Sequence, residues 1–126
     1  MRRLLIFIFL FIGTFYLVIK KYILAEKFYQ KAADRGSATG QNDLGYLYMN
    51  GYGVPQDYTM AAKLFPKAAD QGHAAGLNNL GLLYIKGQGV PQNQEKGCEL
   101  LRQAADKDAK FAQDYTTHCA AKSRDL

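Results

Sequence analysis

The stretch GYGVPQ (residues 51–56) recurs 36 positions later as GQGVPQ (residues 87–92). Each copy holds two glycines and a proline, which suit neither a helix nor a strand interior, because glycine tolerates positive φ and proline lacks an N–H donor. The flanks repeat in the same register, since KAADRG and NDLGYLY before the first loop return as KAADQG and NNLGLLY before the second. A fixed period of this length predicts an array of similar units.

Each unit is predicted to be a helical hairpin whose turn is the repeated loop. Apolar residues follow helical spacing over 38–49 and again over 74–85, which predicts the first helix of each unit. Gly51 lies just beyond the first of these helices, where a left-handed C-cap is expected, and Asp57 suits the N-cap of a second helix. The same residue types, or Asn for Asp, return 36 positions later.

Glycine and proline inside the predicted helices carry further information. Gly45 and Gly81 fall in the middle of the first helices, where glycine costs about 1 kcal/mol relative to alanine. Their recurrence predicts that a second helix crosses closely at this point. Pro66 falls inside the second helix of the first unit, removes its hydrogen bond to residue 62 and predicts a kink.

These residues resemble the Sel1-like repeat family, whose pattern AxxLGxxYxxGxGVxxDxxxAxxxxxxAA spans a unit of the same length. The tetratricopeptide repeat fits less well, because it lacks the GxGV loop and its usual period is about 34 residues. The resemblance covers about residues 25–113, with Gly97 standing where the pattern has alanine. It implies a short right-handed α/α solenoid that binds other proteins, without identifying a partner.

The expected fold is all-α, with two full repeats between two half-repeats and an apolar helix in front. Thr116 and Thr117 give the last helix a polar face, which suits an end cap. Two full repeats are fewer than the roughly three usually needed for stability. The predicted boundaries are 1–24 for the N-terminal segment, 25–126 for the repeat domain, about 37–72 and 73–108 for the full repeats, and about 109–122 for the C-terminal capping helix.

The N-terminal segment has 16 apolar or near-apolar residues, 4–19, between two basic pairs. A membrane-spanning helix needs about 20 residues and a signal-peptide core about 7 to 15, so this length lies between an anchor and a cleaved signal. Ala25 can end a cleavage site, but it is also the first residue in the frame of the repeat. We therefore favour an uncleaved membrane anchor through residues 4–19.

The orientation of this anchor is ambiguous from charge alone. Lysines and arginines after the apolar segment would hold the repeats in the cytoplasm by the positive-inside rule, whereas the signal-like order of the N-terminus favours export. Our prediction is a single-pass protein of a bacterial inner membrane with its repeats facing the periplasm. The alternative is a cleaved protein, periplasmic or secreted.

The two cysteines bear on this choice. Cys98 and Cys119 lie about ten and eleven residues from a predicted turn near Asp108, so a rise of about 1.5 Å per residue puts them at similar heights on antiparallel helices. A disulfide between them would fasten the capping helix and require an oxidising compartment. The alternative is two buried thiols that act as small apolar residues. The possible disulfide favours export.

The net charge of +5 does not predict nucleic-acid binding. Residues 1–35 hold seven basic and two acidic residues, and residues 36–126 hold nine of each, so the excess flanks the membrane segment and the repeats are neutral. The basic stripe that DNA or RNA requires is missing from this pattern.

No constellation in the sequence predicts catalysis, a cofactor, a metal or a small-molecule substrate. His73 lies between helices and is interpreted as structural or solvated, and His118 beside a single cysteine supplies neither a metal site nor an activated nucleophile. GYG and GQG follow predicted helices and lack the third glycine of a dinucleotide-binding loop.

The predicted binding surface lies on the first helix of each repeat and on the first loop. Exposed apolar side chains there would form an interaction patch, and the alternative is that some of them pack against neighbouring helices. The predicted residues are Asn42, Tyr46, Met49, Tyr52, Asn78, Leu82 and Ile85.

Two functions fit a non-catalytic binding module of this kind. The first is an adaptor or regulator that holds another protein at the bacterial envelope. The alternative is an immunity-type envelope protein that neutralises a secreted toxin or effector, as some Sel1-like proteins of the envelope do.

Overall fold

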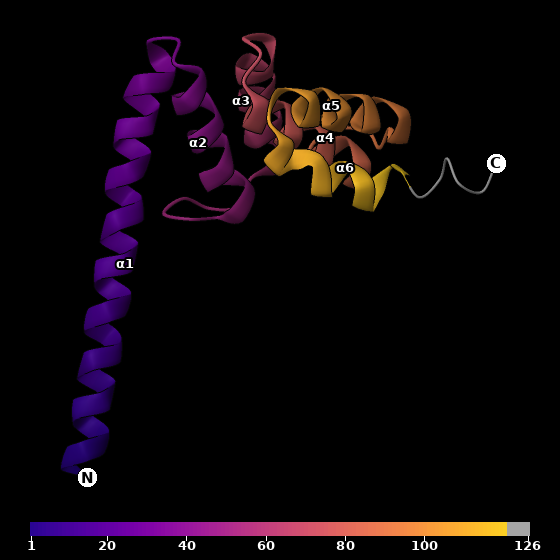
Figure 1. Cartoon of the computed structure of the whole chain (residues 1–126). Coiled ribbons are helices and arrows are strands. Elements are labelled where there is room, and N and C mark those ends of the chain that lie inside the picture. Colours follow the sequence, from indigo (N-terminus) through magenta and orange to yellow (C-terminus); the bar gives the residue numbers. More distant parts are fainter. Residues whose placement is uncertain (121–126) are drawn as a thin grey trace.

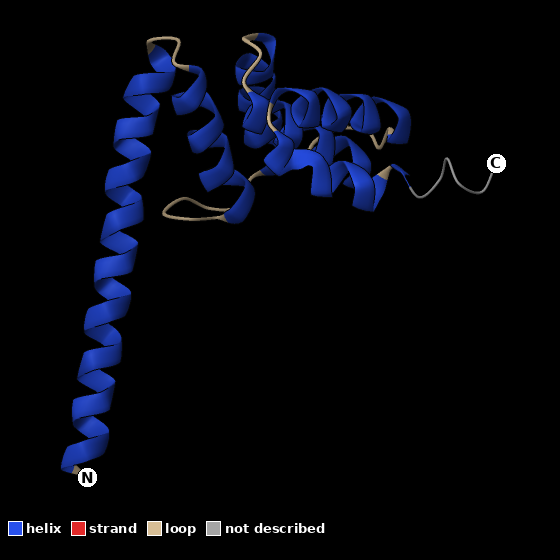
Figure 2. Cartoon of the chain, in the orientation of Figure 1, coloured by secondary structure: helices blue, strands red, loops and turns tan. Residues whose placement is uncertain are grey.

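The computed structural model describes residues 1–120, and this part of the chain is helical without strands. Figure 1 shows a long first helix beside a compact stack of shorter ones, and Figure 2 shows the short loops that join them. The predicted all-α solenoid is therefore confirmed. The elements are α1 (Arg2–Asp34), α2 (Ala38–Asn50), α3 (Tyr58–Asp70), α4 (Ala74–Lys86), α5 (Gln94–Lys107), the 3₁₀ turn η1 (Ala109–Phe111) and α6 (Ala112–His118).

The helices alternate between two roles along the solenoid. The first helices of the hairpins are α2 and α4, and α6 takes the same position at the C-terminal end. The second helices are α3 and α5, and the last part of α1 takes the same position at the N-terminal end. Packing runs from each helix to the next along the chain, from α1 on α2 to α5 on α6. Within residues 1–120 every helix between the two ends therefore lies between two neighbours along the chain, whereas α1 and α6 each have one.

The predicted helix ends are confirmed by their backbone geometry. Gly51 and Gly87 end α2 and α4 in the left-handed region, with φ of 68° and 66°. Asp57 accepts a hydrogen bond from the backbone N–H of Met60 at 3.1 Å, and so caps α3. His73 does the same for α4, where its Nδ1 accepts from the N–H of Gly76 at 3.1 Å. The structural interpretation of His73 is confirmed.

Close helix crossings occur at the predicted mid-helix glycines. A Cβ on Gly45 would lie 2.7 Å from the ring of Phe65, and a Cβ on Gly81 would lie 3.0 Å from the carbonyl oxygen of Gly97. Phe65 is completely buried in a core cluster with Ala61, Leu80 and Leu83. α3 continues through Pro66 as one helix, and the kink stays a prediction.

The C-terminal helix is fastened to the solenoid by the predicted disulfide. Cys98 of α5 and Cys119, just after α6, are bonded with their Cα atoms 5.6 Å apart. The side-chain amide of Gln94 donates to the carbonyl oxygen of His118 at 2.9 Å and adds a second link between the same elements. The capping helix was predicted to reach about residue 122; α6 ends at His118, and residues 121–122 lie outside the described residues.

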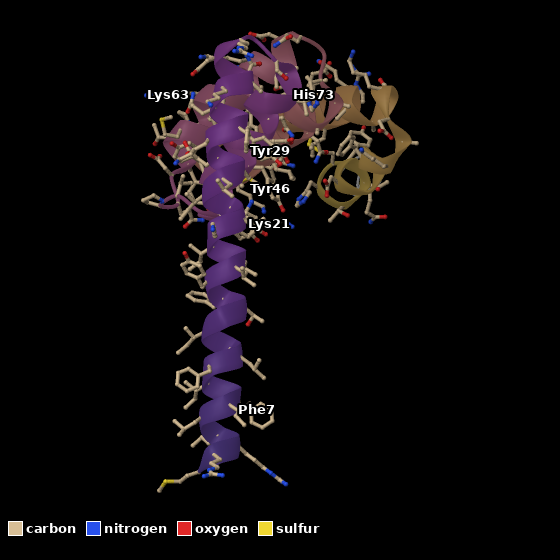
Figure 3. The ribbon with its side chains drawn as sticks, turned by 90° about the vertical axis from the view of Figure 1, so that its left-hand side faces the viewer. Phe7, Lys21, Tyr29, Tyr46, Lys63 and His73 are labelled. Atoms are coloured by element: carbon tan, nitrogen blue, oxygen red, sulfur yellow. A yellow bond between two sulfur atoms is a disulfide. The ribbon has the colours of Figure 1, made fainter. Side chains whose placement is uncertain are left out.

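The first helix runs far beyond the stack. α1 is 33 residues long and none of its residues is buried, although it is long and apolar enough to cross a membrane. At about 1.5 Å per residue such a helix exceeds the roughly 30 Å thickness of a bilayer core. Figure 3 shows Phe7 on the protruding part and Lys21 where the other helices begin.

Candidate interaction surfaces

The last part of α1 packs as the second helix of an incomplete repeat. A Cβ on Gly53 would lie 2.7 Å from the carbonyl carbon of Tyr22, and a Cβ on Gly89 would lie 2.6 Å from the carbonyl carbon of Tyr58. Both pairs are related by the same 36-residue shift. Repeat packing on α1 therefore begins at Tyr22, three residues before the predicted boundary at Ala25.

The membrane-length segment and the repeats share one unbroken helix. α1 continues from the apolar residues 4–19 through Tyr22 to Asp34, where its Ala32 packs against Gly40 of α2. A flexible linker between the segment and the solenoid does not exist in this arrangement. The direction of the apolar segment therefore fixes the orientation of the whole solenoid.

The predicted binding face lies only partly at the surface. Tyr46 and Tyr52 are exposed, by 45% and 38%, and Leu82 and Met49 are half-buried. The expected exposure is wrong for three residues that the structure buries, Asn42, Asn78 and Ile85.

Ile85 is buried because the chain has glycine where the repeat pattern has alanine. A Cβ on Gly97 would lie 2.7 Å from Cδ1 of Ile85 and 2.9 Å from the carbonyl oxygen of Gly81. The missing side chain on α5 thus makes room for Ile85 of α4, which turns into the core.

Asn42 and Asn78 are buried in polar contacts between the first helices. The side-chain amide of Asn79 donates to Oδ1 of Asn42 at 2.9 Å, and that of Asn78 donates to Oδ2 of Asp114 at 2.8 Å. Asn78 and Asp114 stand 36 positions apart in the same register as Asn42, whereas the partner of Asn42 is Asn79, one residue further along α4. In the described part of the chain Oδ1 of Asn78 has no partner. These side chains order the stack and present little surface to a partner.

A cluster of tyrosines and an apolar groove lie where the first loop meets α1. The rings of Tyr22 and Tyr52 stack with centroids 4.9 Å apart, and Tyr46 meets Tyr52 edge-on at 6.0 Å. Beside them is an open groove of about 640 Å³, which is lined by both α1 and the loop. The groove is lined by Phe15, Val18, Ile19, Tyr22 and Ile23 of α1 and by residues 51–55 of the loop.

The N-terminal end of the solenoid exposes apolar side chains that the sequence analysis missed. Phe28 of α1 is 64% exposed, whereas Leu64, its counterpart on α3, is 8% exposed. α3 lies between α2 and α4, but α1 has only the neighbour that corresponds to α4. The open side of α1 also carries Leu24, one turn earlier and exposed. The 36-residue register, which pairs Phe28 with Leu64, was the signal that identifies this surface.

The opposite end of the solenoid is polar. Thr116 and Thr117 are exposed on α6, as the capping role predicts, and the Thr116 hydroxyl donates to the carbonyl oxygen of Ala112 at 2.6 Å. Thr117 stands where Gly81 stands one repeat earlier, so a crossing helix has no glycine to lie against. Within residues 1–120 the two ends therefore differ, and only the N-terminal one exposes large apolar side chains.

Ion pairs form a small network on α5. Arg102 pairs with Glu99 at 2.7 Å and with Asp106 at 2.9 Å, all on the exposed face. The hydrogen bond from Arg102 lowers the pKa of the Glu99 carboxyl below its ordinary value. Exposed pairs of this kind contribute little to stability. Across residues 1–120, no group of three or more His, Cys, Asp or Glu side chains is placed to hold a metal.

Comparison with protein families gives one match. The Sel1 repeat model matches residues 8–37, 38–73 and 74–108. Its first unit begins within the protruding part of α1. There Ile12, Gly13 and Tyr16 have the same spacing as Leu44, Gly45 and Tyr48. In the structure Gly13 has no side chain against it, because α1 continues straight where the later units turn. No curated protein matches the chain significantly.

Solved structures with the same architecture come from bacteria. A Sel1 repeat protein from Oxalobacter formigenes has 35% identity and a TM-score of 0.69 over 75% of this chain and 38% of its own. A protective antigen of uropathogenic Escherichia coli strains, with an SLR fold, has 37% identity and a TM-score of 0.62 over 64% of this chain and 17% of its own. Helicobacter pylori cysteine rich protein B has 22% identity, a TM-score of 0.60 and coverage of 75% and 85%, and supports the fold alone. The chain thus spans well under half of the first two proteins.

Proposed function

The chain belongs to the Sel1 repeat family, and on that premise we propose that it is a non-catalytic protein-binding module anchored in a bacterial inner membrane with its repeats in the periplasm. Sel1 repeat proteins are protein-interaction modules. The observation that carries the proposal is the continuity of α1, which joins an exposed apolar segment directly to the first packed helix of the solenoid.

The packing of α1 supports an anchor that is retained. Cleavage after Ala25 would remove Tyr22, the residue against which Gly53 lies and on which the ring of Tyr52 stacks. It would also shorten α1, the helix that packs on α2 from the N-terminal side. A cleaved chain would thus lose packing at its N-terminal end, whereas the intact chain keeps it.

The disulfide supports an oxidising compartment. The bond between Cys98 and Cys119 joins α5 to the residue that follows α6, and structural disulfides persist outside the cytoplasm. The solved structures from Oxalobacter formigenes and Escherichia coli support a bacterial origin. In a bacterial envelope the periplasm is the compartment in which a disulfide persists.

The partner surface that we propose is the open end of the solenoid, at Leu24 and Phe28. On α3, where Leu64 is the counterpart of Phe28, α2 packs closely on the next residue along the helix and places Gly45 over Phe65. The occupant is accordingly a protein helix with a small residue at the crossing point. Of the predicted face, exposed Tyr46 and half-buried Leu82 form a second surface for the same partner.

The anchor and the compartment are tested by the intact mass of the protein from cells, after thiol alkylation without reduction. We expect the mass of the full chain with neither cysteine alkylated. A mass that begins at Glu26 would overturn the anchor, and two alkylated cysteines would place the repeats in a reducing compartment.

The partner surface is tested by a photoreactive phenylalanine analogue placed at Phe28 in living cells. The same analogue at Lys63, which is exposed on the outer side of α3, is the matched control. We expect a specific crosslinked protein from position 28 and not from position 63. A resident envelope protein as the product supports the adaptor role, and a secreted toxin supports the neutralising role. The same products from both positions would overturn the surface.

A further inference from the structure

We infer that the first loop, residues 51–55, is a second membrane contact, in which Tyr52 lies in the headgroup region and the groove beside α1 takes a phospholipid chain. The inference rests on the proposed anchoring of α1. It states that the loop binds lipid. The anchoring of α1 alone does not require this contact.

The groove joins the apolar segment to the loop. Its α1 wall begins with Phe15, Val18 and Ile19, which belong to the apolar segment, and ends at Tyr22 and Ile23. Tyr22 lies three residues, or about 4.5 Å, beyond Ile19. A bilayer that covers residues 4–19 therefore ends at the level of the loop. Figure 3 shows Lys21 at this level and Phe7 far along the protruding helix.

The side chains at this level suit the membrane interface. Tyrosine is enriched there because its ring is apolar and its hydroxyl is polar. Tyr22, Tyr46 and Tyr52 meet in one cluster, and the stacking of Tyr22 on Tyr52 holds the loop against the helix. Lys20 and Lys21 are exposed next to it, where long basic side chains reach lipid phosphates.

The second loop supplies a natural comparison. GYGVPQ and GQGVPQ differ at a single position, Tyr52 against Gln88. Both loops have the same backbone hydrogen bonds, from Tyr52 to Leu47 at 2.9 Å and from Gln88 to Leu83 at 3.0 Å. The second loop packs on α3 at Tyr58, without an apolar extension beside it. The aromatic residue therefore occurs only in the loop that adjoins the apolar segment.

The test uses single-tryptophan variants, since the chain has no tryptophan. The full-length Tyr52→Trp and Gln88→Trp variants are reconstituted in phosphatidylcholine and phosphatidylglycerol vesicles whose acyl chains carry bromine near the headgroup. We expect at least threefold stronger quenching and a blue-shifted emission for Tyr52→Trp. Quenching of Tyr52→Trp that does not exceed that of Gln88→Trp would overturn the inference.

Two further measurements separate the possible causes of failure. A Phe11→Trp variant in vesicles whose acyl chains carry bromine near their terminal methyl groups reports the apolar segment, because Phe11 lies midway along residues 4–19. Without quenching there, the anchoring itself fails. Quenching there, with no excess quenching of Tyr52→Trp by bromine near the headgroup, overturns the loop contact alone. Amide hydrogen exchange of the unmodified chain in vesicles avoids any folding defect of the variants. We expect slower exchange in residues 51–55 than in residues 87–91, and equal exchange would overturn the contact.

Discussion

Gly53 of the first loop lies directly against the backbone of Tyr22, with 2.7 Å between a Cβ built on Gly53 and the Tyr22 carbonyl carbon. This contact brings the first repeat onto the helix that carries the apolar segment. The same relationship one repeat later, between Gly89 and Tyr58, shows that it belongs to the architecture of the repeat. The end of the membrane-length helix α1 therefore packs in the solenoid in the same way as the second helix of a repeat.

A Gly53→Ala substitution is expected to loosen α1 from the solenoid. The residue has φ of +72°, where a side chain costs about 1–3 kcal/mol, and its Cβ would also collide with the backbone of Tyr22. Gly36→Ala is the control, because Gly36 has φ of +87° and open space around its Cβ position. Thermal unfolding in detergent should show a larger loss for Gly53→Ala; equal losses would mean that the contact with Tyr22 adds nothing.

Removal of the disulfide is expected to destabilise the C-terminal end. Cys98 and Cys119 are separated by 21 residues, and closure of such a loop contributes about 2–4 kcal/mol. The Cys98→Ser/Cys119→Ser variant should unfold at a lower temperature than the oxidised wild type and should be cut sooner by protease between α5 and α6. Its midpoint should not change with reductant, whereas that of the wild type should fall. A wild type that is insensitive to reductant would contradict this role.

The fold could be predicted closely from the sequence because each repeat carries capping residues where its helices end and begin. Gly45 and Gly51 recur 36 positions later, and Asn93 takes the place of Asp57 as a helix N-cap. Each recurrence reports a backbone requirement that is local or nearly so. The spacing of Cys98 and Cys119 was informative because the intervening turn is short.

The candidate surface was less predictable because a solenoid buries more than one face of each helix. Helical spacing placed the leucines on one face of each helix and Asn42, Asn78 and Ile85 on another. It could not predict that neighbouring helices bury this second face as well. The open end at Phe28 was missed for the converse reason, since exposure there follows from a neighbour that the structure lacks.

A Gly97→Ala substitution, which restores the alanine of the repeat pattern, is expected to destabilise this chain. Alanine gains about 1 kcal/mol of helix propensity, but its Cβ would lie 2.9 Å from the backbone oxygen of Gly81 and 2.7 Å from Cδ1 of Ile85. Overpacking of this kind costs about 1–3 kcal/mol. Urea unfolding should show a net loss that is partly relieved in the Gly97→Ala/Ile85→Ala double variant, relative to Ile85→Ala alone. A more stable Gly97→Ala chain would mean that α4 and α5 separate easily.

Phe28→Ala and Leu64→Ala are expected to differ greatly in their effect on stability, although their positions are equivalent. Leu64 is 8% exposed and its truncation should lower the free energy of unfolding by about 2–5 kcal/mol, because it leaves a cavity between packed helices. Phe28 is 64% exposed, so its truncation should change the free energy of unfolding by less than about 0.5 kcal/mol. Urea unfolding of both variants in detergent gives the two values. With folding intact, Phe28→Ala should still reduce crosslinking of the partner from a photoreactive residue at the neighbouring Leu24. A large loss of stability in Phe28→Ala would instead mean that this side of α1 is covered by the chain itself.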